Sequence, residues 1–232
     1  MKIMEIDFHA HILPEMDHGC RNMDMCQEQL NMAAKQQIEV VVATSHFYPH
    51  TETVESFLTR REKAFEKLTA ERVEQMPKVL LGAEVLICSG MDKMERLQEL
   101  CVEGTNVLLF EMPFADMWEQ DLIDTVARLK NECKLQVVLA HAERYRLSEV
   151  EKLLTMGVLV QLNTASLASF RELTRHVRAR KLLKRSCVVA FGSDIHGTQD
   201  QYEVFSKAVK KYHREAEIIL QKTSALLKDV LV

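Results

Sequence analysis

Seven short runs of apolar residues recur along the chain, and longer segments with helical spacing separate them. The runs are nearly continuous in apolar residues, which is typical of strands that are buried on both faces. They occupy residues 4–8, 40–44, 79–83, 107–111, 136–140, 159–163 and 188–192. Each run is therefore predicted to be a strand of a parallel sheet.

The segments between the runs predict amphipathic helices. Apolar side chains recur at helical spacing over residues 54–68, and Arg61 shares their face, where we expect only its aliphatic stem to be buried. Ser148 and Glu151 form a capping-box pattern, which predicts the start of another helix. A last helix is predicted near the end of the chain. Its docking residues are expected to be Ile218, Ile219, Leu226 and Leu227.

This alternation of strands and helices predicts a single α/β domain over residues 1–232. The chain has 232 residues and no break in composition. About seven β–α units in this length favour a closed or nearly closed barrel over an open doubly wound sheet. No GxGxxG or GxxxxGK[ST] pattern occurs, so nucleotide-binding loops are not indicated.

Composition excludes several classes of partner and location. The formal net charge of −4 does not indicate a nucleic-acid partner, which usually needs a basic surface. The amino-terminal MKIMEIDFHAH is too short and too polar for a signal peptide, and no apolar run approaches the ~18 residues of a membrane helix. The six cysteines are scattered, without a CxxC pair, so we expect reduced thiols in a cytoplasmic protein that does not insert into membranes.

Side chains that bind metals follow six of the seven runs, at the strand ends where parallel α/β folds gather functional groups. These residues are His9, His11, His46, Glu84, Glu111, His141, Asp194 and His196. The sixth run ends at Asn163 and offers neither a histidine nor an acid. Each residue taken singly has a structural explanation, such as a hydrogen-bonded core histidine or a helix-capping acid. The combination indicates a metal cluster.

The residue types and their number predict the chemistry of this cluster. Imidazole mixed with carboxylate suits Mn, Fe or Zn better than Ca or Mg alone. So many candidate ligands exceed the needs of one tetrahedral ion and favour two or three ions, bridged by a carboxylate such as Glu84. Adjacent divalent ions activate water and stabilise charged oxygens, so the expected reaction is hydrolysis, most naturally of a phosphate ester.

A cation and two further histidines complete the list of candidates. Arg144 lies three residues beyond His141, where it is either a surface ion-pair residue or a fork that binds phosphate oxygens. His176 and His213 lie in helical, basic segments and are expected at the surface.

The ordered motifs HxH, TSH, GAE, LFE, AHAERY and SDIH, from Asp7 to His196, resemble those of the polymerase and histidinol phosphatase (PHP) superfamily. Within it, the chain is most similar to the bacterial tyrosine phosphatases of capsule and exopolysaccharide synthesis. The resemblance implies a distorted (β/α)7 barrel, a trinuclear site usually activated by manganese, and activity on phosphotyrosine. It also implies that the substrate is an autophosphorylated tyrosine kinase that controls polysaccharide export.

The resemblance further implies roles for individual residues. One ion would be held by His9, His11, Glu84 and Asp194, a second by Glu84, His46 and His141, and the third by Glu111 and His196. Arg144 corresponds to the phosphate-binding arginine, and we expect His196 or His18 to protonate the leaving oxygen.

The chain departs from the family at two places. Asp17-His18-Gly19 stands where the family has Asp-Asp-Gly, so His18 is expected to be a neutral ligand of the third ion. No arginine follows the SDIH motif, where the chain has GTQDQYE. The second departure keeps two alternatives open: a phosphatase of a small metabolite such as histidinol phosphate, and a non-catalytic module that binds a kinase.

The cysteines provide a check on the proposed chemistry. Cysteine-dependent tyrosine phosphatases need an arginine six positions after the nucleophile, and none of the six cysteines has one. The sequence therefore favours water activated by metal ions over a thiolate nucleophile.

Overall fold

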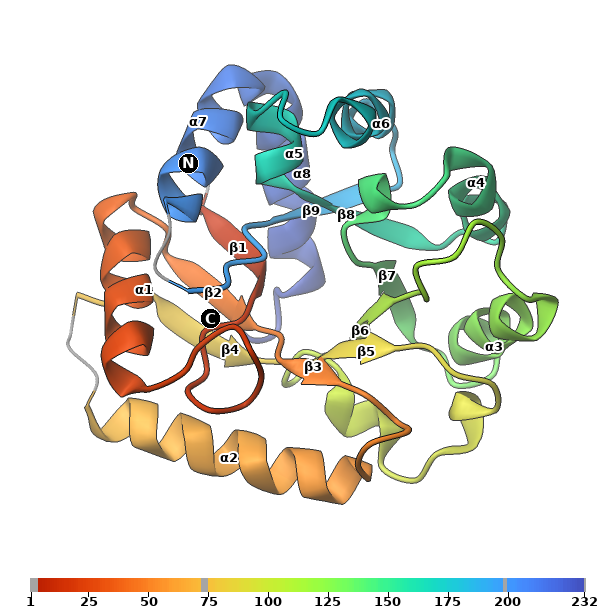
Figure 1. Cartoon of the computed structure of the whole chain (residues 1–232), viewed down its shortest axis with the longest axis horizontal. Coiled ribbons are helices and arrows are strands. Elements are labelled where there is room, and N and C mark those ends of the chain that lie inside the picture. Colours follow the sequence, from red (N-terminus) through yellow and green to blue (C-terminus); the bar gives the residue numbers. More distant parts are fainter. Residues whose placement is uncertain (1–3, 72–74, 198–199, 232) are drawn as a thin grey trace.

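In the computed structural model, which describes residues 4–71, 75–197 and 200–231, strands and helices alternate along the chain (Figure 1). The strands are β1 (Ile6–Ala10), β2 (Val40–Ala43), β3 (His46–Phe47), β4 (Lys78–Leu81), β5 (Glu84–Leu86), β6 (Val107–Glu111), β7 (Gln136–Leu139), β8 (Leu159–Asn163) and β9 (Val188–Gly192). The α-helices are α1 (Met23–Lys35), α2 (Val54–Ala70), α3 (Gln120–Asn131), α4 (Leu147–Thr155), α5 (Thr164–Ala168), α6 (Leu173–Leu183), α7 (Gln201–Lys211) and α8 (His213–Leu226). Short 3₁₀ turns are η1 (Met91–Lys93), η2 (Leu97–Leu100) and η3 (Ala142–Arg144).

The strands form two parallel sheets with the orders β1-β2-β4 and β3-β5-β6-β7-β8-β9. Every predicted run contributes a strand, and the second and third runs each continue into a further short strand after a break. Backbone hydrogen bonds cross these breaks, from Gly82 N to Ala43 O (2.9 Å) and from Glu84 N to Ser45 O (3.0 Å). At the other edge, Asp194 N donates to His9 O (2.8 Å), so the end of β1 lies beside the segment that follows β9. The predicted α/β fold with parallel strands is confirmed.

The apolar core has two parts, one on each face of the strands. The larger part lies between the outer faces of the strands and the surrounding helices, and the smaller part lies on their inner faces. Glu111 of β6 points to the inner side, together with Val107 and Leu109. Leu227, just beyond α8, is fully buried in the inner cluster, and Ile219 is buried in the outer one, so the predicted docking of the last helix is confirmed for these residues. Ile218 is exposed, because neighbouring residues of a helix point about 100° apart.

A bulge in β1 turns the first histidines toward the inner face. The pairing with β2 shifts register between Asp7 and Ala10. Phe8 belongs to the inner cluster, but Ala10 belongs to the outer one. The extra residue therefore reverses the alternation, as β-bulges do, and brings His9 and His11 to the inner face at the strand's carboxyl end.

Two further local predictions from the sequence are wrong. Helix α4 begins at Leu147 with Arg146 at its N-cap, because the turn η3 leads the chain into the helix before Ser148. The Ser148–Glu151 capping box therefore does not form. His176 is buried and its Nδ1 lies 2.8 Å from Ser166 O, although His213 is exposed as predicted.

Arg61 buries its guanidinium as well as its stem, contrary to the prediction. Its Nη1 donates to Gly82 O (2.9 Å) and its Nη2 to Glu99 O (3.0 Å). Gly82 lies in the break between β4 and β5, so Arg61 supports the backbone just before Glu84. The cysteines are free, and Cys20, Cys26 and Cys101 are buried while the other three are half-buried. None of the described helices has the length and apolar character that crossing a bilayer requires.

We expect Arg61→Met to lower the free energy of unfolding by about 2–4 kcal/mol, because two buried carbonyl groups lose their donors. Urea unfolding followed by circular dichroism measures this change. The control is Lys63→Met on the exposed face of α2, which should change stability by less than about 0.5 kcal/mol. Equal effects of the two substitutions would contradict a structural role for the buried guanidinium.

Candidate metal centre

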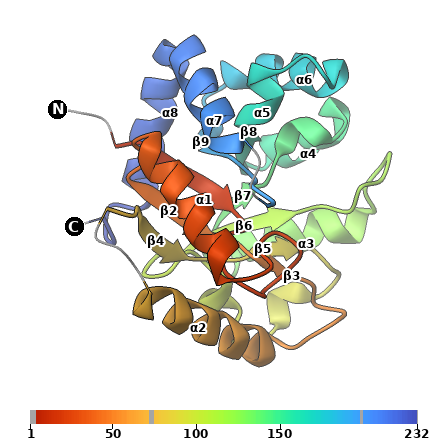
Figure 2. The same ribbon diagram turned by 60° about the vertical axis from the view of Figure 1, so that its left-hand side comes forward.

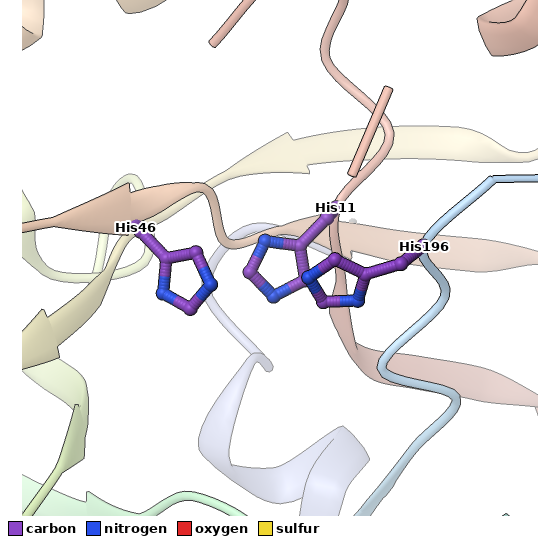
Figure 3. A group of neighbouring side chains, drawn as sticks. All are labelled: His11, His46 and His196. Carbon is purple, nitrogen blue, oxygen red and sulfur yellow. The ribbon is translucent and has the colours of Figure 1, made fainter. Parts of the chain in front are cut away.

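The residues predicted at the strand ends converge on one region. They come from β1, β3, β5, β6 and the segments that follow β7 and β9. The buried members are His9, His11, Glu84, Glu111, His141 and Asp194. His46 and His196 are half-buried, and Figure 3 shows their rings on either side of His11.

Glu84 is the hub of this cluster. Its Oε2 lies 3.0 Å from His46 Nδ1, 3.2 Å from His9 Nε2 and 3.3 Å from His11 Nε2. Its Oε1 lies 2.7 Å from His141 Nε2. The carboxylate is fully buried, and burial alone would raise its pKa. The charge of His9 and hydrogen bonds from His11 and His141 outweigh burial and hold the pKa of Glu84 well below its usual range.

Asp194 contacts the same two histidines, His9 and His11, as Glu84 does. Its Oδ1 lies 3.4 Å from His11 Nε2 and 3.6 Å from His9 Nε2. Its Oδ2 is ion-paired with Arg144 and accepts a hydrogen bond from Asn163 Nδ2 (2.8 Å). Asp194 has a φ of 52° and His141 a φ of 34°, both in the left-handed region that ordinary residues rarely occupy. Such backbone strain at two strand ends is typical of functional sites.

Hydrogen bonds determine which nitrogen of each β1 histidine faces the cluster. His11 Nδ1 donates to Asp17 Oδ2 (2.8 Å). His9 Nδ1 donates to Gln161 Oε1 (3.1 Å), which also accepts from the backbone nitrogen of His141 (2.8 Å). Both Nε2 atoms therefore face the cluster and can bind a metal ion that displaces their protons, the arrangement found in metal-binding histidines whose second nitrogen is held by the protein.

The donor atoms fit a divalent cation. The Nε2 atoms of His9 and His11 lie 3.1 Å apart, which is unfavourable for two lone pairs unless a positive charge lies beside them. Despite these short distances, the buried cluster atoms Glu84 Oε2, His46 Nδ1, His141 Nδ1 and His196 Nε2 form no hydrogen bond of suitable geometry with the described residues. Three groups could each hold an ion: His9, His11 and Glu84; His46, Glu84 and Glu111; and His11, His46 and His196. Nitrogen and carboxylate donors together suit Mn, Fe or Zn.

His196 and His18 differ from the other candidate ligands, the first in its pKa and the second in its exposure. Burial and the charge of His11 lower the pKa of His196 to about 4, so its imidazole is neutral at pH 7, the form that binds metals. His18 is exposed and stacks on His46, with ring centroids 5.1 Å apart, and its centroid lies 4.5 Å from that of His196. His18 thus lies above the cluster and belongs to none of the three groups.

A cavity of about 660 Å³ opens over the cluster. Its floor contains His46, Glu111, Asp194 and His196, with Arg144 beside them. Tyr48 and Phe114 form its aromatic sides. Phe114 is 65% exposed and stacks on His141 and Tyr145, at centroid distances of 5.9 Å and 5.4 Å.

Sequence reasoning missed the polar residues that support the ligands. Asp17 holds His11 and also accepts from His46 N (3.0 Å), and these bonds lower its pKa despite burial. Gln161 and Asn163 come from the sixth run, which had been set aside because it lacks histidine and acid. A signal was present, since Gln161 is a polar residue inside an otherwise apolar run. Gly192 is required beside it, because an added Cβ would lie 2.6 Å from Gln161 Nε2 and from His9 Cβ.

We expect Gln161→Leu to weaken metal binding by about 10- to 100-fold, because His9 loses its orienting acceptor. Titration of chelator-treated protein with manganese, followed by calorimetry and elemental analysis, measures the affinity. Gln120→Leu, an exposed substitution on α3, is the control and should leave the affinity unchanged. Unaltered manganese affinity in Gln161→Leu would contradict a supporting role for this amide.

Comparisons with known proteins identify relatives of this chain. The tyrosine-protein phosphatase CpsB of Streptococcus agalactiae is 24% identical over 97% of this chain and 98% of its own length. The corresponding proteins of Streptococcus pneumoniae (CpsB) and Bacillus subtilis (YwqE) are each 26% identical, over 98% and 96% of this chain and 100% and 91% of their own lengths.

A crystal structure from a study of YwqE and CpsB, described as metal-dependent tyrosine phosphatases, has the same fold. It superposes with a TM-score of 0.79 at 22% identity and covers 97% of this chain and 94% of that chain. Residues 5–224 match the family described as "Capsular polysaccharide synthesis, CpsB/CapC". The chain belongs to this CpsB/CapC family.

Proposed function

We propose that this protein is a metal-dependent phosphomonoesterase that removes phosphate from tyrosine residues of a protein. The observation that carries the proposal is the buried cluster of histidines and carboxylates beneath a cavity that also contains Arg144 and two aromatic side chains. The relatives named above are tyrosine-protein phosphatases, which supports the same activity here.

The fold in this proposal is a distorted (β/α)7 barrel. The two sheets become one when β2 and β3, and likewise β4 and β5, are taken as parts of single interrupted strands. The bonds from Asp194 N to His9 O and from His11 N to Ile195 O (3.3 Å) support closure between the first and last strands. A barrel brings all the carboxyl strand ends to one mouth, where the cavity lies.

We assign two or three divalent ions to the cluster, with manganese first and iron or zinc as alternatives. The ligands are His9, His11, His18, His46, Glu84, Glu111, His141, Asp194 and His196. Glu84 serves more than one ion, consistent with its four histidine neighbours. When bound, such ions lower the pKa of a water molecule and stabilise charge on phosphoryl oxygens.

Arg144 binds the phosphoryl oxygens that face away from the metal ligands. Asp194 holds its guanidinium at the edge of the cavity, and this carboxylate raises the pKa of Arg144 despite burial. Asn163 in turn fixes Asp194. The planar fork therefore meets the substrate already oriented, which is the condition for effective stabilisation of charge in a transition state.

The leaving group is a phenolate in this proposal. Both candidate histidines line the cavity, but the neutral ring of His196 donates its Nδ1 proton to Asp194 O (3.0 Å), which leaves Nε2 as an acceptor. His18 at the mouth is therefore the better candidate for donating a hydrogen bond to the leaving oxygen. A phenolate needs less protonation than an alkoxide. No cysteine lines the cavity among the described residues, and the polar side chains there are imidazoles, carboxylates, one guanidinium and the phenol of Tyr48.

The aromatic sides of the cavity favour an aryl ester. The ring of Tyr48 stacks on that of His46, with centroids 5.1 Å apart, and Phe114 stacks on His141 across the cluster. An exposed phenylalanine is costly in water, and its fixed ring offers a stacking surface for the phenyl group of phosphotyrosine. Phosphoserine would place no ring there.

The physiological substrate in this proposal is a bacterial tyrosine kinase of polysaccharide synthesis, because the chain belongs to a capsular polysaccharide family. The free thiols favour the cytoplasm as the site of action.

The first test is hydrolysis. Purified protein with added manganese should cleave a phosphotyrosine peptide, and a chelator should abolish cleavage until manganese is restored. Alkylation of accessible thiols should leave most of the activity. Faster turnover of histidinol phosphate would favour the metabolite phosphatase, and metal binding without any phosphoester hydrolysis would favour the kinase-binding module.

The second test concerns Phe114. We expect Phe114→Ala to lower kcat/KM for a phosphotyrosine peptide by roughly 10-fold, the scale of losing one apolar contact in a specificity pocket. The value for the matching phosphoserine peptide should stay nearly constant. Met117→Ala is the control, because Met117 is exposed nearby but does not line the cavity. An equal loss on both peptides would contradict an aryl-binding role.

A further inference from the structure

The segment around α6 concentrates positive charge on a chain that is acidic overall. Residues 171–185 hold seven arginines and lysines and one glutamate, whereas the formal net charge of the chain is −4. The side chains of Arg171, Arg180, Lys181 and Lys184 are exposed. Within the described residues, no carboxylate lies within ion-pair distance of these four, although Arg175 pairs with Glu172 and Arg185 with Glu151. These four positive charges are therefore available to bind the negative charges of a partner.

Exposed apolar side chains accompany the charges. Leu173 and Val177 lie one turn apart on α6, Phe170 lies in the loop just before the helix, and all three are exposed. A groove of about 390 Å³ continues past Val177, lined by Arg180, Lys181 and Lys184 with Glu215 opposite them. A surface that combines a groove, apolar contacts and cations suits a polypeptide with acidic side chains.

The amino-terminal end of the basic segment borders the catalytic cavity. Arg171 and Arg175 line a hollow of about 440 Å³ that also contains Arg144 and Asp194. Arg178 Nη1 donates to the backbone oxygen of Arg144 (3.1 Å), which anchors α6 beside η3. Figures 1 and 2 show α6 with α5 and α7 on the side of the molecule opposite α2.

We propose that α6 binds an acidic segment of the same phosphoprotein whose phosphotyrosine enters the metal site. The α6 docking surface consists of Arg180, Lys181, Lys184, Phe170, Leu173 and Val177. This inference rests on the proposed function, because it extends the substrate beyond the phosphotyrosine. Arg171 and Arg175 place the start of the same basic segment at the hollow beside Arg144, so a peptide that leaves the cavity through this hollow reaches α6. This position favours a peptide over a membrane.

The helix length sets the spacing of the acidic segment. An 11-residue helix is about 16 Å long at 1.5 Å per residue. An extended peptide covers about 3.3 Å per residue, so about five residues span the helix. The acidic residues should lie about five to ten positions from the phosphotyrosine, on one side of it in sequence.

The experiment compares phosphotyrosine peptides that differ only in one segment. Four glutamates are placed at these positions before or after the phosphotyrosine, and matching peptides carry glutamines. With wild-type protein at low salt, one glutamate peptide should have a KM about 10-fold lower than its glutamine partner, and 0.5 M salt should remove the difference. The variant Arg180→Glu/Lys181→Glu/Lys184→Glu should abolish the preference while keeping wild-type turnover of p-nitrophenyl phosphate.

The matched control reverses three exposed lysines of α1 and α2, as Lys35→Glu/Lys63→Glu/Lys67→Glu, and should keep the preference. No preference in the wild type, or an equal preference in both triple variants, would overturn the docking site. So would binding of the wild type to anionic phospholipid vesicles, lost in the α6 variant, without any effect of the glutamates. Failure to hydrolyse p-nitrophenyl phosphate or any peptide would instead refute the proposed function.

Discussion

The fully buried carboxylate of Glu84 is the constraint on which the site depends. An isolated buried carboxylate is strongly unfavourable, so the surrounding residues must supply positive charge or hydrogen-bond donors. Four histidine nitrogens lie within 3.3 Å of its two oxygens. Those nitrogens belong to the end of β1, to β3 and to the turn that follows β7. Their positions require the intervening β–α units to be in place. The donor atoms around Glu84 are therefore in place only when the whole fold has formed.

Irregular backbone is what directs the side chains to this point. The bulge in β1 reverses the alternation so that His9 and His11 join the face of Glu111. The left-handed conformations of His141 and Asp194 turn the chain at the ends of two further strands. Each deviation from regular geometry costs conformational energy, and each serves the cluster.

In the proposed function, substrate recognition is divided between groups near the cluster and groups farther from it. Arg144 and the aromatic sides of the cavity suit the phosphoryl and aryl groups, which are common to all phosphotyrosines. Helix α6 lies beside the turn that carries Arg144 and presents charge to residues farther along a protein substrate. A protein phosphatase needs both, because binding energy away from the reacting group distinguishes one phosphoprotein from another.

The sequence by itself determined the order of strands and helices and the residues of the candidate cluster, because both follow local rules. Buried strands produce apolar runs, and parallel strands bring their carboxyl ends together, so His46, Glu84 and His141 could be grouped although they are far apart in the chain. Supporting residues do not follow such rules. Three buried polar side chains form hydrogen bonds with groups from other segments of the chain: Gln161, Arg61 and His176. Their roles depend on where the fold places those groups. Only the tertiary structure decides which groups form these hydrogen bonds. A polar side chain can be buried where a hydrogen-bond partner is available, and its neighbours in the sequence do not specify that partner.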